Sequence, residues 1–571
     1  MMFKSFLVFI SAFVLLAEDS IAIGQTGRPD NDPCSFVLPY HRDSRLKASS
    51  DSVQVDWIRQ YVSGYEPAFG FAYAIAVDAS GNVIVTGSSW GDNQLPDFVT
   101  IKYTISGDTL WVRRYNSPGN NWDSPRALAI DTEGNVYVTG ETYSDSTYFN
   151  YVTIKYDAAG IQQWVVQYDG PSNNDDGATG IVVDGSGNVY VTGQSSGSGT
   201  SWDYATIKYN SSGQQLWVAR YNGPGSQADF ATGLAIDSSG NVYVTGTSDD
   251  LSVNFYPAYA TVKYNSAGVE QWVTRYRELW SYATAIAVDT SGNAHVTGRS
   301  YSLGTYYDYA TIKYNTMGVQ QWVARYHGGL SDDFAYALAV DGAGNVYVTG
   351  EGGPETIDYA TVRYSSSGVE QWVRTYNGPG NAVDRGNAIA LDAGGNVYVA
   401  GESRGASGDD DFATVKYSPT GDEQWVVRYN GPGDTFDLAA AIALDASRNV
   451  YVTGRSAQTG GSLITTIKYT EIPVSVKEND GGTPREFALE QNYPNPFNPT
   501  TNFRFGLPQS ALVMLKVYDV LGKEVTTLVN EPFKPGSYQL TWDATGLPSG
   551  VYFYRLQAGS FSETKKLILL R

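Results

Sequence analysis

Hydrophobic and polar positions follow one pattern that repeats eight times along the chain. In residues 337–350 a run of small and aliphatic residues leads to Asp341, then a turn with Gly344 and Asn345, then a Val/Tyr-rich segment ending in Thr-Gly. A repeat of about 50 residues is typical of a solenoid, a propeller or an array. The Asp recurs as Asp78, Asp131, Asp184, Asp237, Asp289, Asp341, Asp392 and Asp445.

Each copy predicts four strands. The alternation on either side of the turn indicates a hairpin. A third strand ends in Tyr, as in 308–314, and a fourth carries Trp, as in 320–326. Four strands in roughly 52 residues are typical of a propeller blade. The Trp recurs as Trp57, Trp111, Trp164, Trp217, Trp272, Trp322, Trp372 and Trp425.

The composition of the strands predicts their order within a blade. The first strand is almost entirely Ala, Ile, Leu and Val, as expected of a strand buried on both faces near the axis. The fourth alternates Trp and Tyr with Arg or Gln, which suits an outer edge. Because the strand around Trp57 precedes the first hairpin and the last copy has no fourth strand after 464–469, the N-terminal strand should complete the last blade. The predicted fold is all-β, with an eight-bladed propeller over residues 53–470.

The repeated turn has local chemistry of its own. Asp and Asn side chains can bond nearby backbone groups, and Gly adopts positive φ at little cost. The eighth copy has Arg448 where the others have Gly, so that turn should be strained by about 1 kcal/mol. Carboxylate and carbonyl oxygens also suit calcium, but one carboxylate per turn falls short of the six to eight oxygens that calcium takes, so a structural role is expected.

The ends of the chain differ from the repeats. Residues 1–24 have a basic start and an apolar run over 6–17, typical of a signal peptide. That run is too short to span a bilayer, so no transmembrane anchor is expected. Residues 25–52 form an N-terminal arm, and their Cys34 is the one cysteine, so no internal disulfide is possible.

A second domain is expected after the repeats. Residues 471–486 are polar, which predicts a linker. Residues 487–571 hold five strand-like runs separated by Gly and Pro, which predicts a small immunoglobulin-like β-sandwich. The runs are 501–506, 513–519, 537–542, 551–557 and 564–570.

The net charge and the absence of known catalytic motifs argue against several classes of function. A net charge of -21 argues against nucleic acid or an anionic membrane as partner. No metalloprotease helix, phosphate loop or nucleophile elbow is present, so neither enzyme activity nor a cofactor is expected. Of the three histidines, His41, His295 and His327, His295 replaces a blade Tyr and should be structural. The basic residue of the third strand, such as Lys313, recurs in all eight copies, which favours blade architecture.

One end of the propeller is the candidate binding face, because the loops entering the first strand and those between strands two and three should lie there together. Variable loops on a rigid scaffold often bind ligands. Capping of local turns by each Asp is the competing interpretation. Eight residues before the anchor lie Asp123, Asp176, Asp229, Asp333, Asp384 and Asp437; at the start of the third strand lie Asp97, Asp203, Asp308, Asp358 and Asp411. The aromatic residues of these loops include Trp90, Trp122, Tyr148, Trp202, Tyr256, Trp280 and Tyr306.

Two resemblances follow from these motifs. The pattern in 236–246, Ile-Asp-Ser-Ser-Gly-Asn-Val-Tyr-Val-Thr-Gly, resembles the bacterial β-propeller repeat (SBBP) family, which implies the fold and an extracellular location. The tail resembles the C-terminal sorting domain of the type IX secretion system of Gram-negative bacteria. Its motifs are 492–499 (Asn-Tyr-Pro-Asn-Pro-Phe-Asn-Pro), 517–523, Trp542-Asp543, 547–552 and 565–567. This resemblance implies export through the periplasm and recognition of residues 487–571 by the secretion machinery.

The sequence therefore predicts a secreted or cell-surface binding module, expected to be a monomer, that recognises a glycan, a protein or a cation. Two alternatives stay open at this point. One is an extracellular polysaccharide-active enzyme that uses a carboxylate pair. The other is a structural or adhesion component of the surface.

Overall fold

The computed structural model describes residues 36–37, 46–48, 53–64, 68–91, 93–249, 256–329, 332–433, 435–471, 476–479, 484–544 and 547–570. The predicted signal peptide, Cys34, His41 and most of the predicted N-terminal arm lie outside the described residues. The chain divides into two compact units, which we describe separately. Throughout the described ranges the regular elements are strands, and no helix there has the length and apolarity to cross a membrane.

Eight sheets make up the first unit, six with four strands and two with a fifth strand added at the edge, and the prediction of eight four-stranded blades is confirmed. Blades 1 to 4 are β4 (Gly70–Val77), β5 (Val83–Trp90), β6 (Pro96–Tyr103), β7 (Thr109–Tyr115); β8 (Asp123–Ile130), β9 (Val136–Ser144), β10 (Tyr148–Tyr156), β11 (Gln162–Tyr168); β12 (Asp176–Val183), β13 (Val189–Ser196), β14 (Trp202–Tyr209), β15 (Gln215–Tyr221); and β16 (Asp229–Ile236), β17 (Val242–Ser248), β18 (Ala258–Tyr264), β19 (Glu270–Tyr276).

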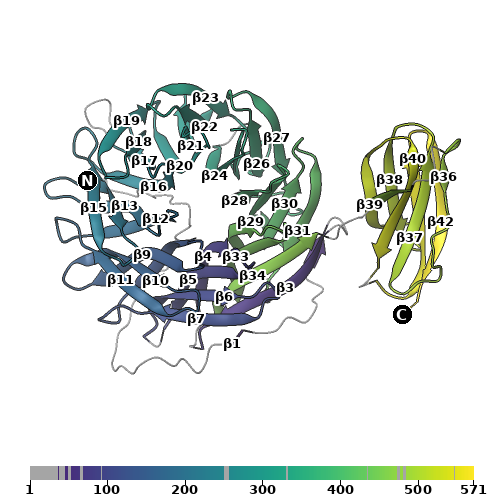
Figure 1. Cartoon of the computed structure of the whole chain (residues 1–571), viewed down its shortest axis with the longest axis horizontal. Helices are drawn as coiled ribbons and strands as arrows, with labels where there is room; N and C mark the ends of the chain where they lie inside the picture. Colours follow the sequence, from purple (N-terminus) through teal and green to yellow (C-terminus); the bar gives the residue numbers. More distant parts are fainter. Residues whose placement is uncertain are drawn as a thin grey trace. The chain divides into compact units, whose positions relative to one another are not determined.

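Blades 5 to 8 continue in the same order, and Figure 1 shows the blades arranged around a common centre. They are β20 (Ser281–Val288), β21 (Ala294–Ser302), β22 (Tyr306–Tyr314), β23 (Gln320–Tyr326); β24 (Phe334–Val340), β25 (Val346–Glu351), β26 (Tyr359–Tyr364), β27 (Glu370–Tyr376); β28 (Asp384–Leu391), β29 (Val397–Arg404), β30 (Asp410–Tyr417), β31 (Glu423–Tyr429); and β32 (Asp437–Leu444), β33 (Val450–Gln458), β34 (Gly461–Glu471), β3 (Val53–Val62).

The ring closes as predicted, because β3 joins β34 in the last sheet. On β3, Trp57 donates its indole N–H to the carbonyl oxygen of Ile105 in blade 1, at 3.0 Å. The backbone N–H of Ser462 donates to the carbonyl of Ala68, just before blade 1, at 2.8 Å. The two ends of the repeat region are thereby bonded to each other and to the first blade.

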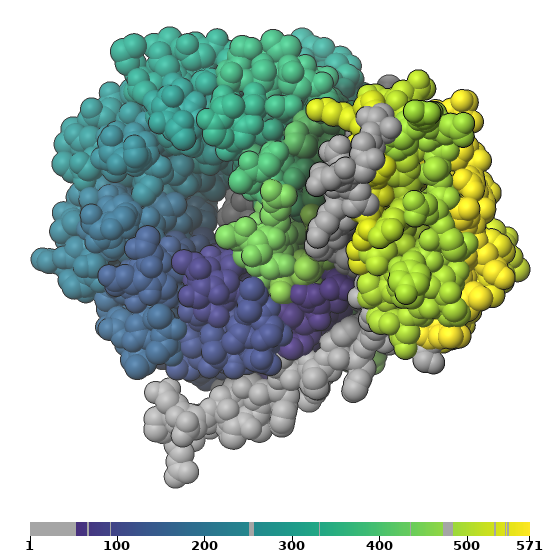
Figure 2. All heavy atoms as spheres, turned by 45° about the vertical axis from the view of Figure 1, so that its right-hand side comes forward, coloured from purple at the N-terminus to yellow at the C-terminus, as the bar shows by residue number. Residues whose placement is uncertain are grey.

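The first strand of each blade is innermost, also as predicted, and the first strands of neighbouring blades pack together. The expected burial on both faces is wrong, however. Positions 74–77 of β4 are only half-buried, whereas β17 and β18 are buried throughout. The space-filling view shows the reason, because the first strands border an opening at the centre of the ring (Figure 2).

Each first strand has a one-residue bulge, and in four blades the bulged residue bonds to the next blade. The register between first and second strands shifts once in every blade, for example between Ala178 and Gly180. The extra residue, Thr179, donates its hydroxyl to the carbonyl of Ala231 in the next blade at 2.9 Å. Thr232, Thr284 and Asn387 donate in the same way to Ala283, Ala335 and Ala439. The bulge, which bends a strand and re-aims a side chain, is thus used to join blades.

The outer part of each blade is fastened to the next one by its third and fourth strands. The Lys263 ammonium and the Trp272 indole both donate to the carbonyl oxygen of Thr316 in the next blade, at 3.4 and 3.0 Å. The same pairing recurs from blade to blade, as with Lys313 and Trp322 on Ser366. The architectural role predicted for the recurring basic residue is confirmed.

Two short strands at the N-terminal side were not predicted. β1 (Phe36–Val37) pairs with β3 outside blade 8, and β2 (Leu46–Ala48) lies next to β31 outside blade 7. Part of the predicted arm therefore covers the outer edges of two blades, which limits pairing of those edges with other chains.

The C-terminal unit consists of two four-stranded sheets around one apolar core, in agreement with the predicted sandwich. The predicted runs correspond to β37 (Thr500–Leu507), β38 (Ala511–Tyr518), β40 (Gly536–Asp543), β41 (Gly550–Ala558) and β42 (Phe561–Leu569). Three strands were not predicted: β35 (Val476–Asn479), β36 (Ala488–Leu489) and β39 (Glu524–Phe533). β35 lies in the predicted linker yet pairs with β40.

Candidate functional site

The two ends of the ring have different connections. At the turn end, hairpins join strands one to two and three to four. At the crossover end, loops join strands two to three and lead from each blade to the next. Asp176 pairs with Ser195, which pairs with Asp203, so both predicted sets of acidic residues lie at the crossover end.

The aspartates that precede or begin the first strands are buried and bind the crossover loops. Asp229, which is fully buried, accepts the backbone N–H of Gly223 at 2.6 Å. Burial raises the pKa of Asp229 and Asp333 to about 6 and that of Asp437 to about 7. Equivalent bonds run from Ser117 to Asp123, Gly170 to Asp176, Gly328 to Asp333, Gly378 to Asp384 and Gly431 to Asp437. Loop capping thus occupies these six residues, and a ligand role for the whole set stays a prediction.

Most aspartates of the third strands are paired with arginines of the fourth. Asp203 accepts from the Arg220 guanidinium at 2.9 Å, and Asp97, Asp308 and Asp411 do so from Arg114, Arg325 and Arg428. Asp358 differs, because its blade has Thr375 where the others have Arg. Burial raises the pKa of Asp358, and the Thr356 hydroxyl, which donates to it, opposes that rise.

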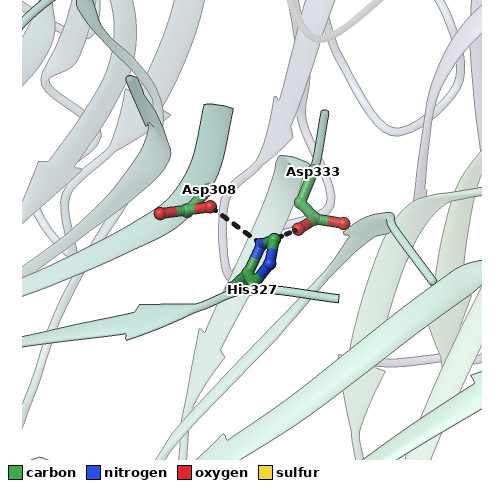
Figure 3. A group of neighbouring side chains, drawn as sticks. All are labelled: Asp308, His327 and Asp333. Atoms are coloured by element: carbon green, nitrogen blue, oxygen red, sulfur yellow. Dashed lines mark ion pairs between the residues drawn. The ribbon is translucent and has the colours of Figure 1, made fainter. Parts of the chain in front are cut away.

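Blades 5 and 6 bring two of these aspartates together around a histidine. Asp308 lies on β22, His327 directly follows β23, and Asp333 directly precedes β24. His327 Nδ1 lies 3.2 Å from Asp308 Oδ1 and 3.6 Å from Asp333 Oδ2 (Figure 3). The three donor atoms lie within 4.8 Å of one another. We call these three side chains the Asp-His-Asp cluster.

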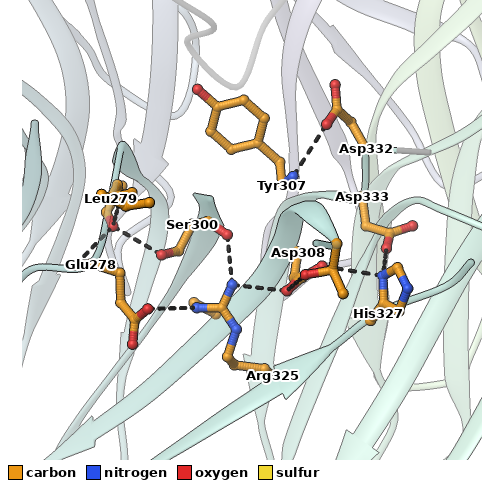
Figure 4. Close-up of polar contacts among 12 residues, drawn as sticks. Glu278, Leu279, Ser300, Tyr307, Asp308, Arg325, His327, Asp332 and Asp333 are labelled. Atoms are coloured by element: carbon orange, nitrogen blue, oxygen red, sulfur yellow. Dashed lines mark hydrogen bonds and ion pairs between the residues drawn. The ribbon is translucent and has the colours of Figure 1, made fainter. Parts of the chain in front are cut away.

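The surroundings of the cluster hold its carboxylates in place (Figure 4). Arg325 donates to the other oxygen of Asp308 and to the carbonyl of Ser300, at 2.9 and 2.7 Å. The backbone N–H of Asp333 donates to the carbonyl of Tyr307 at 2.7 Å. Both carboxylates are buried, whereas the His327 side chain is 39% exposed.

His327 was not predicted as a site residue. Four other copies have Asn at this position (Asn116, Asn222, Asn377 and Asn430), so alignment of the repeats against one another marks the histidine as a departure. His295 has the structural role expected of it. Its Nε2 lies 3.2 Å from Asp289 Oδ2, where other blades place a Tyr hydroxyl, and burial lowers its pKa to about 4.

Aromatic residues gather beside the Asp-His-Asp cluster at the crossover end of blade 5 and the start of blade 6. Tyr301 contacts Trp280, Tyr307 and Tyr306, with ring centroids 5.2, 5.4 and 6.3 Å apart. The Arg299 guanidinium lies over the ring of Phe334 at 4.4 Å. We define the blade-5 aromatic cluster as Trp280, Tyr282, Tyr301, Tyr306, Tyr307 and Phe334. Two of its rings reach solvent, since Tyr306 is 56% and Trp280 37% exposed.

The turn end shows what the repeated Asp does. Asp341 Oδ1 accepts the N–H groups of Ala343 and Asn345, both at 2.9 Å. Its Oδ2 accepts from the Asn345 amide at 2.7 Å and the Tyr347 hydroxyl at 3.2 Å. These bonds match the structural role expected of the turn.

Comparison with known families identifies the class of protein. Residues 110–146, 163–199, 216–251 and 321–353 match the β-propeller repeat model SBBP, so the first unit is an SBBP-type β-propeller. Residues 491–570 match the secretion system C-terminal sorting domain. The chain is a secreted β-propeller protein exported by type IX secretion, and its sorting domain implies secretion or a cell-surface location.

Individual relatives are distant. The uncharacterized WD repeat-containing protein L264 of Acanthamoeba polyphaga mimivirus is 23% identical over 33% of this chain and 17% of its own length. The β-propeller domain of the trilobed protease from Pyrococcus furiosus has 8% identity and a TM-score of 0.35, covering 63% of this chain and 95% of that one. A polysaccharide lyase, ulvan lyase of family PL25, has 12% identity and a TM-score of 0.36, covering 62% and 90%. At these scores the similarities say nothing about function.

Proposed function

We propose that the propeller is an extracellular binding module for a neutral polysaccharide, and that the blade-5 aromatic cluster is its contact surface. The observation that carries this proposal is the exposure of Trp280 and Tyr306 at the rim of a packed aromatic group. Flat aromatic faces backed by other rings offer a rigid apolar platform with polar tips, which suits the C–H face and the hydroxyls of a sugar.

The backbone of Tyr306 has a strained hairpin conformation, which Tyr148 of blade 2 shares. Its φ is 63°, in the left-handed region, which costs a residue with a Cβ about 1–2 kcal/mol. Here the strained residue is also the most exposed tyrosine of the cluster.

Charge favours a neutral ligand over an acidic one. The net charge of -21 repels polyanions, and Arg299, the cation of the cluster, has its guanidinium against the rings of Tyr282, Tyr307 and Phe334. A sugar chain without carboxylates or sulfates meets no such repulsion.

The enzyme alternative has less support. A carboxylate pair that attacks or protonates a glycosidic bond must reach the substrate. Asp308 and Asp333 are the closest such pair described at this site, and both side chains are almost completely buried. Contact through exposed aromatic rings requires no such access.

The test is binding of the purified protein to a panel of neutral and anionic polysaccharides, followed by isothermal titration calorimetry on the best ligand. Tyr306→Ala and Trp280→Ala should each weaken binding about tenfold or more, because each removes a central contact. Their melting temperatures should stay close to that of the unmodified protein, since both rings are at the surface.

The matched control is Tyr148→Ala in blade 2. Tyr148 occupies the same hairpin position, is 52% exposed and has a φ of 57°, but lies outside the blade-5 aromatic cluster. It should leave the affinity unchanged. Equal losses for Tyr148→Ala and Tyr306→Ala, or binding of acidic polysaccharides only, would reject the proposed surface.

A further inference from the structure

We propose that Asp308, His327 and Asp333 bind one divalent first-row transition metal ion, with zinc as the best fit. The proposal is independent of the polysaccharide ligand. It assigns to the junction of blades 5 and 6 a metal site that the other repeats do not share.

The first argument is the geometry of the donor atoms. Zinc binds imidazole nitrogen at about 2.0–2.1 Å and carboxylate oxygen at about 2.0–2.2 Å, so two ligands at a tetrahedral angle lie roughly 3.3–3.5 Å apart. His327 Nδ1 lies 3.2 Å from one carboxylate oxygen and 3.6 Å from the other (Figure 3). Both distances from the imidazole nitrogen thus match the spacing of zinc ligands, and all three donor atoms lie within 4.8 Å of one another.

The second argument is unmet hydrogen-bonding capacity. Within the described part of the chain, Asp308 Oδ1 and Asp333 Oδ1 are buried, and the neighbour positioned to donate to Asp308 Oδ1 is His327 Nδ1, at 3.2 Å. A buried, unpaired carboxylate oxygen is costly unless a cation or a donor satisfies it. Asp308 Oδ1 is the oxygen nearest His327, so its free capacity is directed into the cluster.

The third argument is how this junction departs from its neighbours. In blades 2, 3, 4, 7 and 8 the Asp that begins the first strand is paired in the sheet with Thr or Ser, such as Ser195 opposite Asp176. In blade 6 the second strand has Gly352 near Asp333, and a Cβ on this glycine would lie 2.3 Å from Asp333 Oδ1. The Asp333 carboxylate therefore occupies the place that a Ser or Thr side chain takes in those blades, so it has no hydroxyl partner there, and the neighbouring Asn of other copies is replaced by His327.

The donor set selects the kind of ion. One imidazole and two carboxylates suit zinc, manganese or iron, whereas calcium requires six to eight oxygen ligands. Arg325 holds the second oxygen of Asp308 at 2.9 Å, and the N–H of Gly328 donates to Asp333 Oδ2 at 2.6 Å. Such outer contacts orient the ligands of a metal. With His327 39% exposed, a fourth coordination position is accessible to water or to a ligand oxygen.

The experiment uses the full-length protein, stripped with a chelator and dialysed. We expect zinc titration to give one ion per chain by calorimetry and by metal analysis after gel filtration, and zinc to raise the melting temperature. Calcium at the same concentration should do neither. Absence of zinc binding by the unmodified protein would refute the site and leave the cluster as a hydrogen-bonded ion pair.

The diagnostic variant is His327→Asn, which restores the residue of four other copies and should fold. It should weaken zinc binding at least 100-fold. The matched control is His295→Tyr, which likewise restores a repeat residue, but at the turn end, and should bind zinc as tightly as the unmodified protein. Asp333→Asn provides a second ligand variant, expected to lose the zinc-induced rise in melting temperature. Zinc binding unchanged in His327→Asn would overturn the proposal, as would its loss in His295→Tyr alone.

Discussion

The turn end and the crossover end of the ring differ in how regularly their residues repeat from blade to blade. At the turn end the blades repeat an Asp that binds its own turn and the neighbouring side chains, as Asp237 does with Asn241 and Tyr243. At the crossover end the loops vary in length and composition, and blade 5 alone contributes Arg299, Trp280 and His327 to one neighbourhood. Repetition therefore builds the scaffold, and departures from it mark the places where ligands are expected. This comparison can be tested from both sides.

The largest expected effect is on stability at the turn end. Asp237→Ala removes the acceptor for the N–H groups of Ser239 and Asn241 and for the Tyr243 hydroxyl. The free energy of unfolding should fall by about 2–4 kcal/mol, because several partly buried hydrogen bonds to one carboxylate are lost together. Denaturant unfolding measures this, with Ser238→Ala, at an exposed position of the same turn, as the neutral control.

The affinity of Asp237→Ala for the polysaccharide and for zinc should be unchanged at a temperature where the variant is folded. If Asp237→Ala weakened binding as much as Tyr306→Ala does, the turn end would contribute to binding as well as to stability, and the proposed difference between the two ends would be wrong.

A smaller effect is expected from pH at the crossover end. The pKa values of Asp229 and Asp437 are raised to about 6 and 7, so the folded state binds protons more tightly than the unfolded state, where Asp titrates near 3.9. Stability should consequently fall as pH rises from about 4 to 7. Thermal unfolding at pH 5 and 7.5 measures this difference, and Asp437→Asn should reduce it.

The stability contributed by the turn end should change with pH in the opposite direction. Burial alone would raise the pKa of Asp237, but hydrogen bonds from Asn241 and Tyr243 outweigh it and lower the pKa. That stabilisation is present above about pH 4 and is lost as pH falls further. A melting temperature that rose steadily from pH 5 to 7.5 would contradict the assignment of raised pKa values at the crossover end.

The smallest effect on stability is expected at the turn that contains Arg448. Arg448 has a φ of 67°, where seven copies use Gly, as the sequence predicts. Arg448→Gly should therefore stabilise the protein by about 1 kcal/mol, and Gly344→Ala should destabilise it by a similar amount. Unfolding curves of the two variants measure both. A destabilised Arg448→Gly would mean that the contact of Arg448 with Asp392, at 3.7 Å, outweighs the strain.

The sequence predicts whatever is repeated. The number of blades, the strand order, the closing strand and the turn chemistry all follow from eight aligned copies. Features that occur once were missed, such as the pairing of β1, β2 and β35, because two to four residues of strand carry too little pattern to be recognised. The roles of individual aspartates depend on partners far along the chain. Nothing near Asp308 in sequence indicates that Arg325 holds one of its oxygens and that His327 approaches the other.

The placement of β3 beside β34 also determines at what point during synthesis the last blade can form. The strand made first in the propeller must wait for residues some 400 positions later before its sheet exists. Contacts between such distant segments slow folding. A chain interrupted before residue 461 would present an unpaired strand at each end, and exposed edges of this kind promote association with other chains. Closure by the N-terminal strand thus makes synthesis through β34 a condition for forming the last blade.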